Sequence, residues 1–295
     1  MTTPIFYDEA YVCAAHSFDT TRKARWVYEG QQEDPNPSIE FQSPPPLTAK
    51  EVESVHDPAY VKAIETGEPR SLAESQGFAW DAGLWKMALA VNGGMVSAAK
   101  AAMQSGHESG SLSSGFHHAR RETGKGFCTF NGLVLAAKAA LGDGAERVLI
   151  LDLDAHCGGG THSLIKDDPR IWHVDVSVNA FDRYDSTERS TLSIVNAAND
   201  YLPTIDRELK RLLRTAPRFD LCLYNAGMDP HERCAIGGLP GIMMATLAKR
   251  EMIVYEWCIV NRVPVAFALA GGYVGPDLTQ EELVMLHRLT IEAAG

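Results

Sequence analysis

The sequence lacks the dense cysteine pattern and the long apolar runs that mark secreted and membrane proteins. Its six cysteines are scattered over 295 residues with no CxxC pair, so we expect reduced thiols rather than a disulfide framework. No stretch approaches the ~20 apolar residues of a membrane helix, and the first residues lack the basic and then apolar pattern of a secretory leader. These absences predict a soluble cytoplasmic protein with no membrane partner.

Positive charge is also scarce. The chain has 27 Lys and Arg residues against 38 Asp and Glu residues, a net charge of −11. A nucleic-acid-binding surface must neutralise phosphates, so nucleic acid is not an expected partner, whereas a cationic or neutral small substrate is compatible with this charge. The sequence neither indicates nor excludes an oligomer.

Short apolar, β-branched runs alternate with longer segments of helical periodicity. The predicted strands are Arg147–Leu153, Ile171–Val176, Leu221–Tyr224 and Val263–Ala268, and the predicted helices are Ala79–Met103 and Thr191–Leu213. The proline-rich segment Gln31–Pro46 is predicted as a surface loop. This alternation predicts an α/β protein with a parallel sheet covered on both faces, and functional residues just after the strands.

The first of these strands ends in a segment rich in metal-ligating side chains, LDLDAHCGGG. Alternate side chains of an extended segment share a face, so Asp152, Asp154 and His156 point the same way and could hold one metal ion. A polar strand end followed by a glycine-rich turn explains the same residues equally well.

Two other segments carry side chains suited to catalysis. His117 and His118 are adjacent, and neutral imidazoles can pass protons to and from a reacting group, although an isolated pair of histidines is usually structural. Tyr273 follows the glycines of AGGY directly after a predicted strand, where its hydroxyl could stabilise an oxyanion. By itself, that segment is only a strand end.

Together, in this order, these segments resemble the histone deacetylase family and its acetylpolyamine amidohydrolase relatives. The resemblance is carried by GFHHA with GFCTFN, LDLDAH, YNAGMD with CAIGGL, and AGGY, and weaker similarity near residues 5–8 and 55–61 extends it over nearly the whole chain. It implies one deacetylase-like domain over residues 1–295 with the arginase/deacetylase fold. That fold has three layers, a central, mostly parallel sheet with helices on both faces.

The resemblance also implies a role for individual residues in zinc-dependent amide hydrolysis. It places His117 as the base, His118 as the proton donor to the leaving amine, and Tyr273 as the group that polarises the acyl carbonyl. It implies one zinc ion per chain, with Asp154 and His156 as ligands. The remaining implied residues are Asp152 and Ser177 at a structural monovalent cation such as potassium, and Gly126, Phe127, Gly271 and Gly272 at the substrate pocket.

The third zinc ligand departs from the family pattern. Counted from Asp229, the family's third aspartate falls on Cys234, and thiolate is a good zinc ligand. Asp229 or His231 could replace it, and Cys234 could instead be a small buried residue without a metal. We therefore predict an Asp154, His156 and Cys234 site, with these alternatives open.

Further departures lie beside the site. Gly159 stands where the family has a carboxylate or amide partner for the second histidine, so His118 is predicted to lack that partner. Cys157 and Asn179 each replace a histidine. Changes gathered in one place indicate either retuned chemistry or lost activity.

Three functional hypotheses follow. The first is a deacylase acting on an acylated amine such as acetyl-lysine, an acetylpolyamine or a small acylated metabolite. The second is a deacetylase-like protein that binds acylated ligands or regulates a partner without hydrolysis. The third is a metal-dependent hydrolase of a non-acetyl substrate, since a fold does not determine a substrate.

Overall fold

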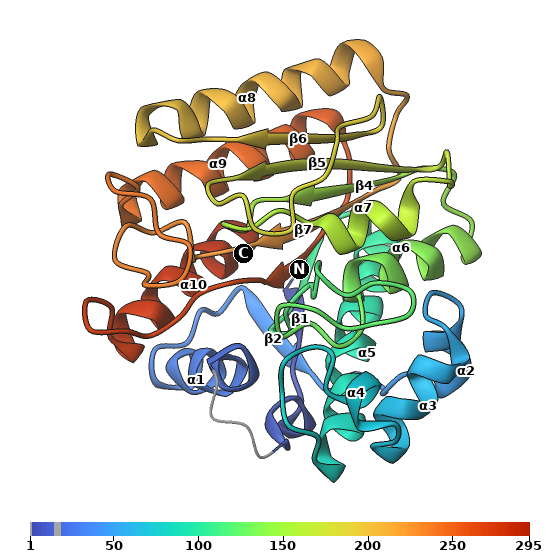
Figure 1. Ribbon diagram of the computed structural model, residues 1–295. Coiled ribbons are helices and arrows are strands. Elements are labelled where there is room, and N and C mark those ends of the chain that lie inside the picture. The colour runs from blue at the N-terminus through green and yellow to red at the C-terminus, as the bar shows by residue number, and fades with distance from the viewer. Residues whose placement is uncertain (1, 15–18) are drawn as a thin grey trace.

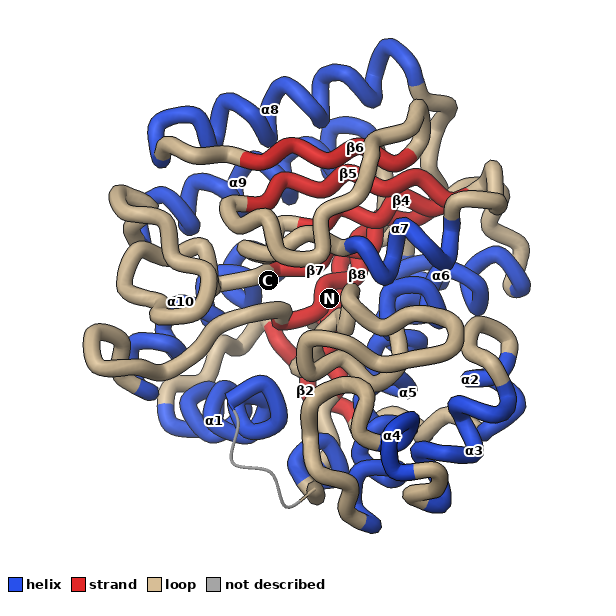
Figure 2. The backbone as a smooth tube through the Cα atoms, in the orientation of Figure 1, coloured by secondary structure: helices blue, strands red, loops and turns tan. Residues whose placement is uncertain are grey.

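The computed structural model describes residues 2–14 and 19–295. These residues form one eight-stranded sheet with helices packed around it (Figures 1 and 2). The strand order is β2-β1-β3-β8-β7-β4-β5-β6, and all neighbouring strands are parallel. The strands are β1 (Thr3–Phe6), β2 (Ile39–Gln42), β3 (Glu108–Ser111), β4 (Val148–Asp152), β5 (Ile171–Ser177), β6 (Ser190–Ile194), β7 (Leu221–Ala226) and β8 (Val265–Leu269).

Helices cover both faces of this sheet, as its buried apolar strands require (Figure 1). Helices α5, α6 and α7 lie on one face, with α2, α3 and α4 beside α5, and α8, α9 and α10 lie on the other face with α1 against α10. Their bounds are η1 (Glu9–Val12), α1 (Asp19–Glu33), α2 (Ala49–Glu53), α3 (Pro58–Thr66), α4 (Arg70–Ala73), α5 (Ala82–Ser105), α6 (Gly132–Gly142), α7 (Gly159–Ile165), α8 (Ala198–Thr215), α9 (Met244–Asn261) and α10 (Gln280–Ala294). The predicted three-layer α/β fold class is confirmed.

The four predicted strands correspond to β4, β5, β7 and β8, and the first predicted helix corresponds to α5. Two boundaries were wrong. The predicted helix Thr191–Leu213 begins as strand β6, and α8 starts only at Ala198. The predicted loop Gln31–Pro46 contains strand β2, which pairs with β1 at the sheet edge. Both are short strands at the edges of the sheet, where pairing with one neighbouring strand decides the conformation more than the pattern of the segment itself.

A buried arginine fixes the loops at the carboxyl edge of the sheet. Arg250 on α9 is fully buried and donates to the backbone oxygens of Leu153 (3.3 Å) and Gly227 (2.5 Å), just after β4 and β7. Its charge is balanced by Glu251. One side chain therefore holds together the two loops that carry the polar residues described next.

No helix among the described residues is long and apolar enough to cross a bilayer.

Candidate active site

The carboxyl ends of β4 and β7 bring Asp154, His156 and Asp229 together. The Nδ1 atom of His156 lies 3.2 Å from Asp154 Oδ1 and 3.2 Å from Asp229 Oδ2. All three side chains are buried, and one ligand atom from each falls within 4.8 Å of the other two. Carboxylate oxygens and imidazole nitrogens are both ligands of zinc, and catalytic zinc sites use three protein ligands.

The surroundings of this group fit a small cation. Backbone N–H groups hold the outer oxygens: Ala155 donates to Asp229 Oδ1 (3.0 Å) and Gly271 donates to Asp154 Oδ2 (2.7 Å). Asp229 Oδ2 is buried and lies 3.2 Å from His156 Nδ1, but it makes no hydrogen bond of good geometry among the described residues. A Cβ atom at Gly271 would lie only 2.1 Å from that oxygen, so glycine keeps a side chain out of the space between the carboxylates. These donors and this space would suit a divalent ion.

His117 is joined to the end of β4. Its Nδ1 lies 2.8 Å from Asp152 Oδ2, and its Nε2 lies 3.6 Å from Asp154 Oδ1. Burial disfavours the charged imidazole, but the negative charges of Asp152 and Asp154 outweigh burial and raise the pKa of His117 to about 10. His117 is therefore the stronger base of the two adjacent histidines.

The surroundings of His118 shift its pKa in the opposite direction. Its Nε2 lies 3.1 Å from the Nε2 of His117, and its Nδ1 lies 3.1 Å from Asp182 Oδ2. Burial, followed by the positive charge of His117, lowers the pKa of His118 to about 4, although Asp182 acts in the other direction. A proton placed on His118 is therefore readily given up.

Asp182 is itself tightly held. The Arg120 guanidinium and the Lys125 ammonium both contact Asp182 Oδ1, and the Asp182 side chain is buried. Burial opposes its charge, but hydrogen bonds from His118 and Lys125 lower the pKa of Asp182 to about 2. Its backbone has φ +61°, a left-handed conformation that aspartate tolerates better than most residues. The residue is thus an ionised carboxylate with a fixed direction.

Tyr273 follows β8 and lines the same pocket as His118 and His156. Burial, and then the negative charges of Asp229 and Asp154, raise the pKa of the Tyr273 phenol well above its usual value. The hydroxyl therefore stays protonated, which suits a hydrogen-bond donor to a carbonyl oxygen.

A pocket of about 350 Å³ opens from this cluster to solvent. Its walls are aromatic and aliphatic apart from the histidines, Asn179 and the tyrosine; they are formed by His118, Gly126, Phe127, His156, Asn179, Phe181, Ile236 and Tyr273. The sequence predicted Gly126 and Phe127 at this pocket but missed Phe181, whose ring stands perpendicular to that of His118 at 5.0 Å. Of the two predicted glycines after β8, Gly271 supports Asp154, while a Cβ at Gly272 would meet His287 of α10 rather than the pocket.

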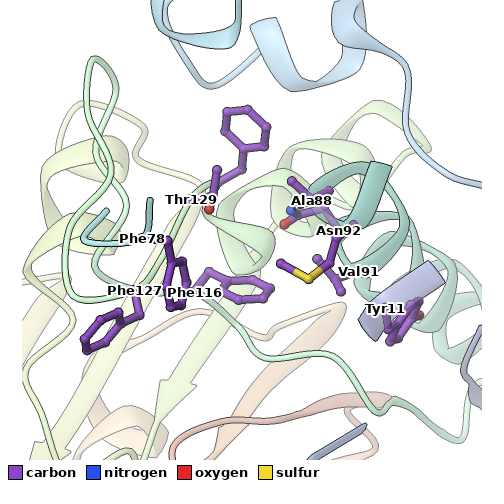
Figure 3. Close-up of a pocket in the computed structure, with 10 residues that line it drawn as sticks. Tyr11, Phe78, Ala88, Val91, Asn92, Phe116, Phe127 and Thr129 are labelled. Atoms are coloured by element: carbon purple, nitrogen blue, oxygen red, sulfur yellow. Dashed lines mark hydrogen bonds between the residues drawn. The ribbon is translucent and has the colours of Figure 1, made fainter. Parts of the chain in front are cut away.

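A second, small and mainly apolar cavity of about 20 Å³ adjoins the Phe127 side of this pocket. Figure 3 shows Phe78, Phe116 and Phe127 grouped at one end and Tyr11 at the other, with residues of α5 between them. The Phe78 and Phe127 ring centroids are 5.1 Å apart. Phe127 is therefore packed against an aromatic neighbour and presents a firm wall to the pocket.

Comparison with known proteins identifies the family. The profile described as "Histone deacetylase domain" matches residues 16–289. This protein belongs to the histone deacetylase family. An uncharacterised protein of the cyanobacterium Picosynechococcus is 32% identical over 251 residues, which are 82% of this chain and 81% of that protein. The mouse polyamine deacetylase HDAC10 is 31% identical over 196 residues, which are 59% of this chain but only 28% of that longer protein.

Solved structures show the same fold at low sequence identity. The HDA15 HD domain aligns with a TM-score of 0.81 and 17% identity, covering 99% of this chain and 90% of that chain. The acetylpolyamine aminohydrolase of Burkholderia pseudomallei aligns with a TM-score of 0.78 and 16% identity, covering 100% and 99%. At these identities the likeness concerns the fold alone.

The structure does not bring Cys234, the predicted third ligand, into the group of Asp154, His156 and Asp229. Its Sγ contacts the backbone oxygens of Ile236 (3.4 Å) and Tyr273 (3.7 Å), and burial raises the pKa of the thiol to about 12. Of the two alternatives, Asp229 joins the group, whereas the Nδ1 atom of His231 accepts from the Arg233 backbone N–H. Spacing along the loop favoured Cys234, whereas Asp229 lies near the carboxyl end of β7, which runs beside β4.

The expectation that His118 lacks a carboxylate partner was wrong. Asp182 supplies the carboxylate from the loop of residues 178–185, between β5 and β6. A Cβ atom at Gly159 would lie 2.2 Å from the Asp182 backbone oxygen, so the absence of a side chain at 159 is what admits Asp182. Asp182 could not be identified from the sequence, because it is a single aspartate in an irregular segment whose residues show no helical or strand periodicity.

The other two departures contact the same loop. The Cys157 thiol donates to the backbone oxygen of Asn179 (3.3 Å), and Asn179 Oδ1 accepts from the backbone N–H of Phe181 (2.8 Å). Cys157, Asn179 and Gly159 thus all shape the segment that presents Phe181 to the pocket and Asp182 to His118.

The predicted monovalent-cation residues lie close together behind His117. Asp152 Oδ1 accepts from the Asn225 side-chain amide (2.8 Å), and the Ser177 hydroxyl donates to Asp175 Oδ1. His173, on the same strand as Asp175, lies beside Asp152 and forms a second buried group with these two carboxylates. The sequence analysis missed Asp175 and His173.

Proposed function

We propose that this protein is a metal-dependent amidohydrolase that removes an acetyl group from an acylated amine. One observation carries the proposal: Asp154, His156 and Asp229 lie at one pocket with the paired histidines and a protonated tyrosine. A ligand group, a base, a proton donor and an oxyanion donor are the parts that amide hydrolysis requires.

Asp154, His156 and Asp229 would hold the metal ion, and their nitrogen and oxygen donors favour zinc, one ion in this site per chain. Such an ion would lower the pKa of a water molecule and polarise the acyl carbonyl. The position of Asp229 Oδ2 supports this assignment, because it is buried, makes no hydrogen bond of good geometry among the described residues and lies 3.2 Å from His156 Nδ1, a second prospective ligand atom.

His117 would take the proton from the attacking water at Nε2. Its Nδ1 faces Asp152, which fixes the ring and stabilises the imidazolium that forms. The water oxygen then bonds to the acyl carbon.

Tyr273 and His118 would act on the two ends of the amide that breaks. The Tyr273 hydroxyl would donate to the carbonyl oxygen as it gains negative charge. His118 would give a proton to the departing nitrogen. The C–N bond breaks, and the products are acetate and a free amine.

The pocket supports a substrate with an aliphatic stem. Phe127 and Phe181 both line it, and no lysine, arginine, aspartate or glutamate is among its lining residues. An alkyl chain would pack between such aromatic walls while the acyl group reaches the histidines. Acetylpolyamines fit this pocket and the chain's net charge of −11, which favours the approach of cations. The mouse relative's name, polyamine deacetylase, agrees with this choice.

The direct test measures acetate release and bound zinc on the same purified protein. We expect release from N-acetylputrescine or N8-acetylspermidine, with slower release from an acetyl-lysine peptide, and loss of both after chelation. Binding of these ligands without release by zinc-loaded protein would instead support the non-hydrolytic alternative. Release of a different acyl group alone would support the hydrolase of a non-acetyl substrate.

A matched pair of variants tests the ligand assignment. Asp229→Asn should lose the zinc of this site and its activity, whereas Cys234→Ser should keep both. The reverse result would restore Cys234 as the third ligand. Since Cys234 and Gly159 were the grounds for the non-hydrolytic hypothesis, and Asp229 and Asp182 offer the missing carboxylates, the geometry favours hydrolysis.

We also propose a reducing compartment, the cytoplasm, as the site of action. All six cysteines are free thiols, and five of them are buried. Fractionation of the source cells with an antibody would test this placement, and recovery in an oxidising compartment would contradict it.

A further inference from the structure

Arg250, which the proposed function does not use, lies behind the two carboxylates of the prospective metal site. It is on α9, it is 0% exposed, and its Nη1 atom donates to the backbone oxygens of Leu153 (3.3 Å) and Gly227 (2.5 Å). Leu153 immediately precedes Asp154, and Gly227 lies two residues before Asp229. The guanidinium therefore contacts both loops that bear these carboxylates.

The ion pair with Glu251 does not by itself account for this buried arginine. That pair uses the Nε and Nη2 atoms of Arg250, whereas Nη1 faces the two loop carbonyls and the Tyr201 hydroxyl (3.3 Å). Moving an ion pair from water into a protein interior costs about as much as the attraction between the charges returns. An apolar pair of similar volume would fill this space as well, so the hydrogen bonds to the loops are what the guanidinium adds.

The two loops approach each other closely at Gly227. A Cβ atom there would lie 2.6 Å from the Asp154 Cα and 2.7 Å from Asp229 Oδ1. No side chain of residue 227 separates the loops, so the distance between the two carboxylates depends on how firmly the loops are held. Because buried carboxylates repel each other, a contact from outside the pair must keep them together.

We infer that Arg250 is a positioning residue for the metal site: by holding the Leu153 and Gly227 carbonyls, it keeps Asp154 and Asp229 at the separation that one divalent ion requires. Its hydrogen bonds within the described residues reach neither carboxylate, so it acts through the two backbones. Groups that support metal ligands in this way commonly change the metal affinity by about 10- to 100-fold. Any effect on hydrolysis rests on the proposed function, whereas the effect on the loops does not.

The test must remove the guanidinium without leaving Glu251 as an unpaired buried charge. The double variant Arg250→Met/Glu251→Gln does so, and Glu251→Gln alone is its reference. Arg211→Met is the matched control, because the half-buried Arg211 of α8 also pairs with a glutamate, Glu208 (2.8 Å), and its other hydrogen bond reaches Thr191, outside the two loops.

The first measurement is the zinc dissociation constant of the full-length protein, by competition with a chromophoric chelator. The double variant should bind zinc about 10- to 100-fold more weakly than Glu251→Gln, and Arg211→Met should bind it like the wild type. Arg250→Lys keeps the charge but lacks the planar fork of donors, so it should also bind more weakly, and it provides the comparison if the double variant does not fold.

Denaturant titration of the metal-free proteins separates this role from a purely structural one. A lower midpoint together with an unchanged zinc dissociation constant in the folded variants would overturn the inference, because loss of packing alone gives that result.

Crystal structures of the metal-free proteins test the geometry without zinc or hydrolysis. In the double variant the two loops should separate, so that the ligand atoms of Asp154, His156 and Asp229 no longer all lie within 4.8 Å of one another. Unchanged ligand positions would contradict the inference. A wild type that binds zinc at this group but releases no acetate would refute the proposed function and leave the positioning role intact.

Discussion

The two adjacent histidines, His117 and His118, are each paired with a carboxylate, but the carboxylates come from different kinds of structure. Asp152, the partner of His117, is the last residue of a fully buried central strand. Asp182, the partner of His118, lies in the irregular 178–185 loop and has a left-handed backbone. The first pair is fixed by the sheet itself, and the second by contacts from several segments.

The two environments also produce opposite pKa shifts. Carboxylates outweigh burial at His117 and raise its pKa to about 10, while burial and the neighbouring charge lower the pKa of His118 to about 4. Adjacent residues of the same type can therefore take different roles in proton transfer, because the surrounding charges and not the side chains differ.

The largest effect should come from His117, which is paired with Asp152 at the end of β4. His117→Ala should lower kcat by about 10³-fold, because it removes the base, and His118→Ala by about 10²-fold. Neither histidine is in the Asp154 group, so zinc content should stay unchanged, as elemental analysis can check. Equal losses in the two variants would break the distinction between base and proton donor.

The pair of His118 and Asp182 should be tested by a substitution at Asp182. Asp182→Asn should lower kcat by about 10- to 100-fold, since the imidazolium of His118 loses its carboxylate partner. A carboxylate raises the pKa of a neighbouring imidazole, so its removal lowers the pKa of His118 further. The limb of the kcat–pH profile that requires protonated His118 should therefore move to lower pH.

The exposed Asp185, in the same loop, provides the matched control. Asp185→Asn should leave both kcat and the profile unchanged. A fall in kcat for Asp182→Asn with no movement of the profile would mean that Asp182 only supports the loop.

Because Gly159, the first residue of α7, lies close to Asp182, we expect a side chain at position 159 to destabilise the fold. Gly159→Ala should lower the free energy of unfolding by about 1–3 kcal/mol, because its Cβ would meet the Asp182 backbone oxygen at 2.2 Å. Gly142→Ala, at the end of α6, is the control, since nothing lies within 4 Å of its added Cβ. Denaturant titration should show a lower midpoint only for Gly159→Ala, and equal midpoints would contradict the close approach.

The smallest effect should come from Lys125, a partly exposed side chain that contacts Asp182. Lys125→Met should lower kcat by only about two- to fivefold, because Arg120 still contacts Asp182 and partly exposed ion pairs contribute little. The difference between wild type and variant should shrink in high salt. A loss as large as that of Asp182→Asn would show that Lys125, and not Arg120, holds the carboxylate in place.

The sequence by itself determined the parts that depend on local pattern. Apolar runs identified the central strands β4, β5, β7 and β8, and the segment after β4 supplied Asp154 and His156 to one group, whereas Asp152, predicted beside them, belongs to another. The resemblance to the deacetylases rested on such segments too, because residues fixed to strand ends keep their spacing.

Only the tertiary structure decided the partners that arrive from distant segments. Asp229 joins Asp154 because β7 lies beside β4, and Asp182 reaches His118 because Gly159 leaves room for the loop. His173 and Asp175 meet Asp152 through strand pairing. A contact between segments depends on strand order and on the volume of a third residue, and neither quantity is contained in the spacing along one segment.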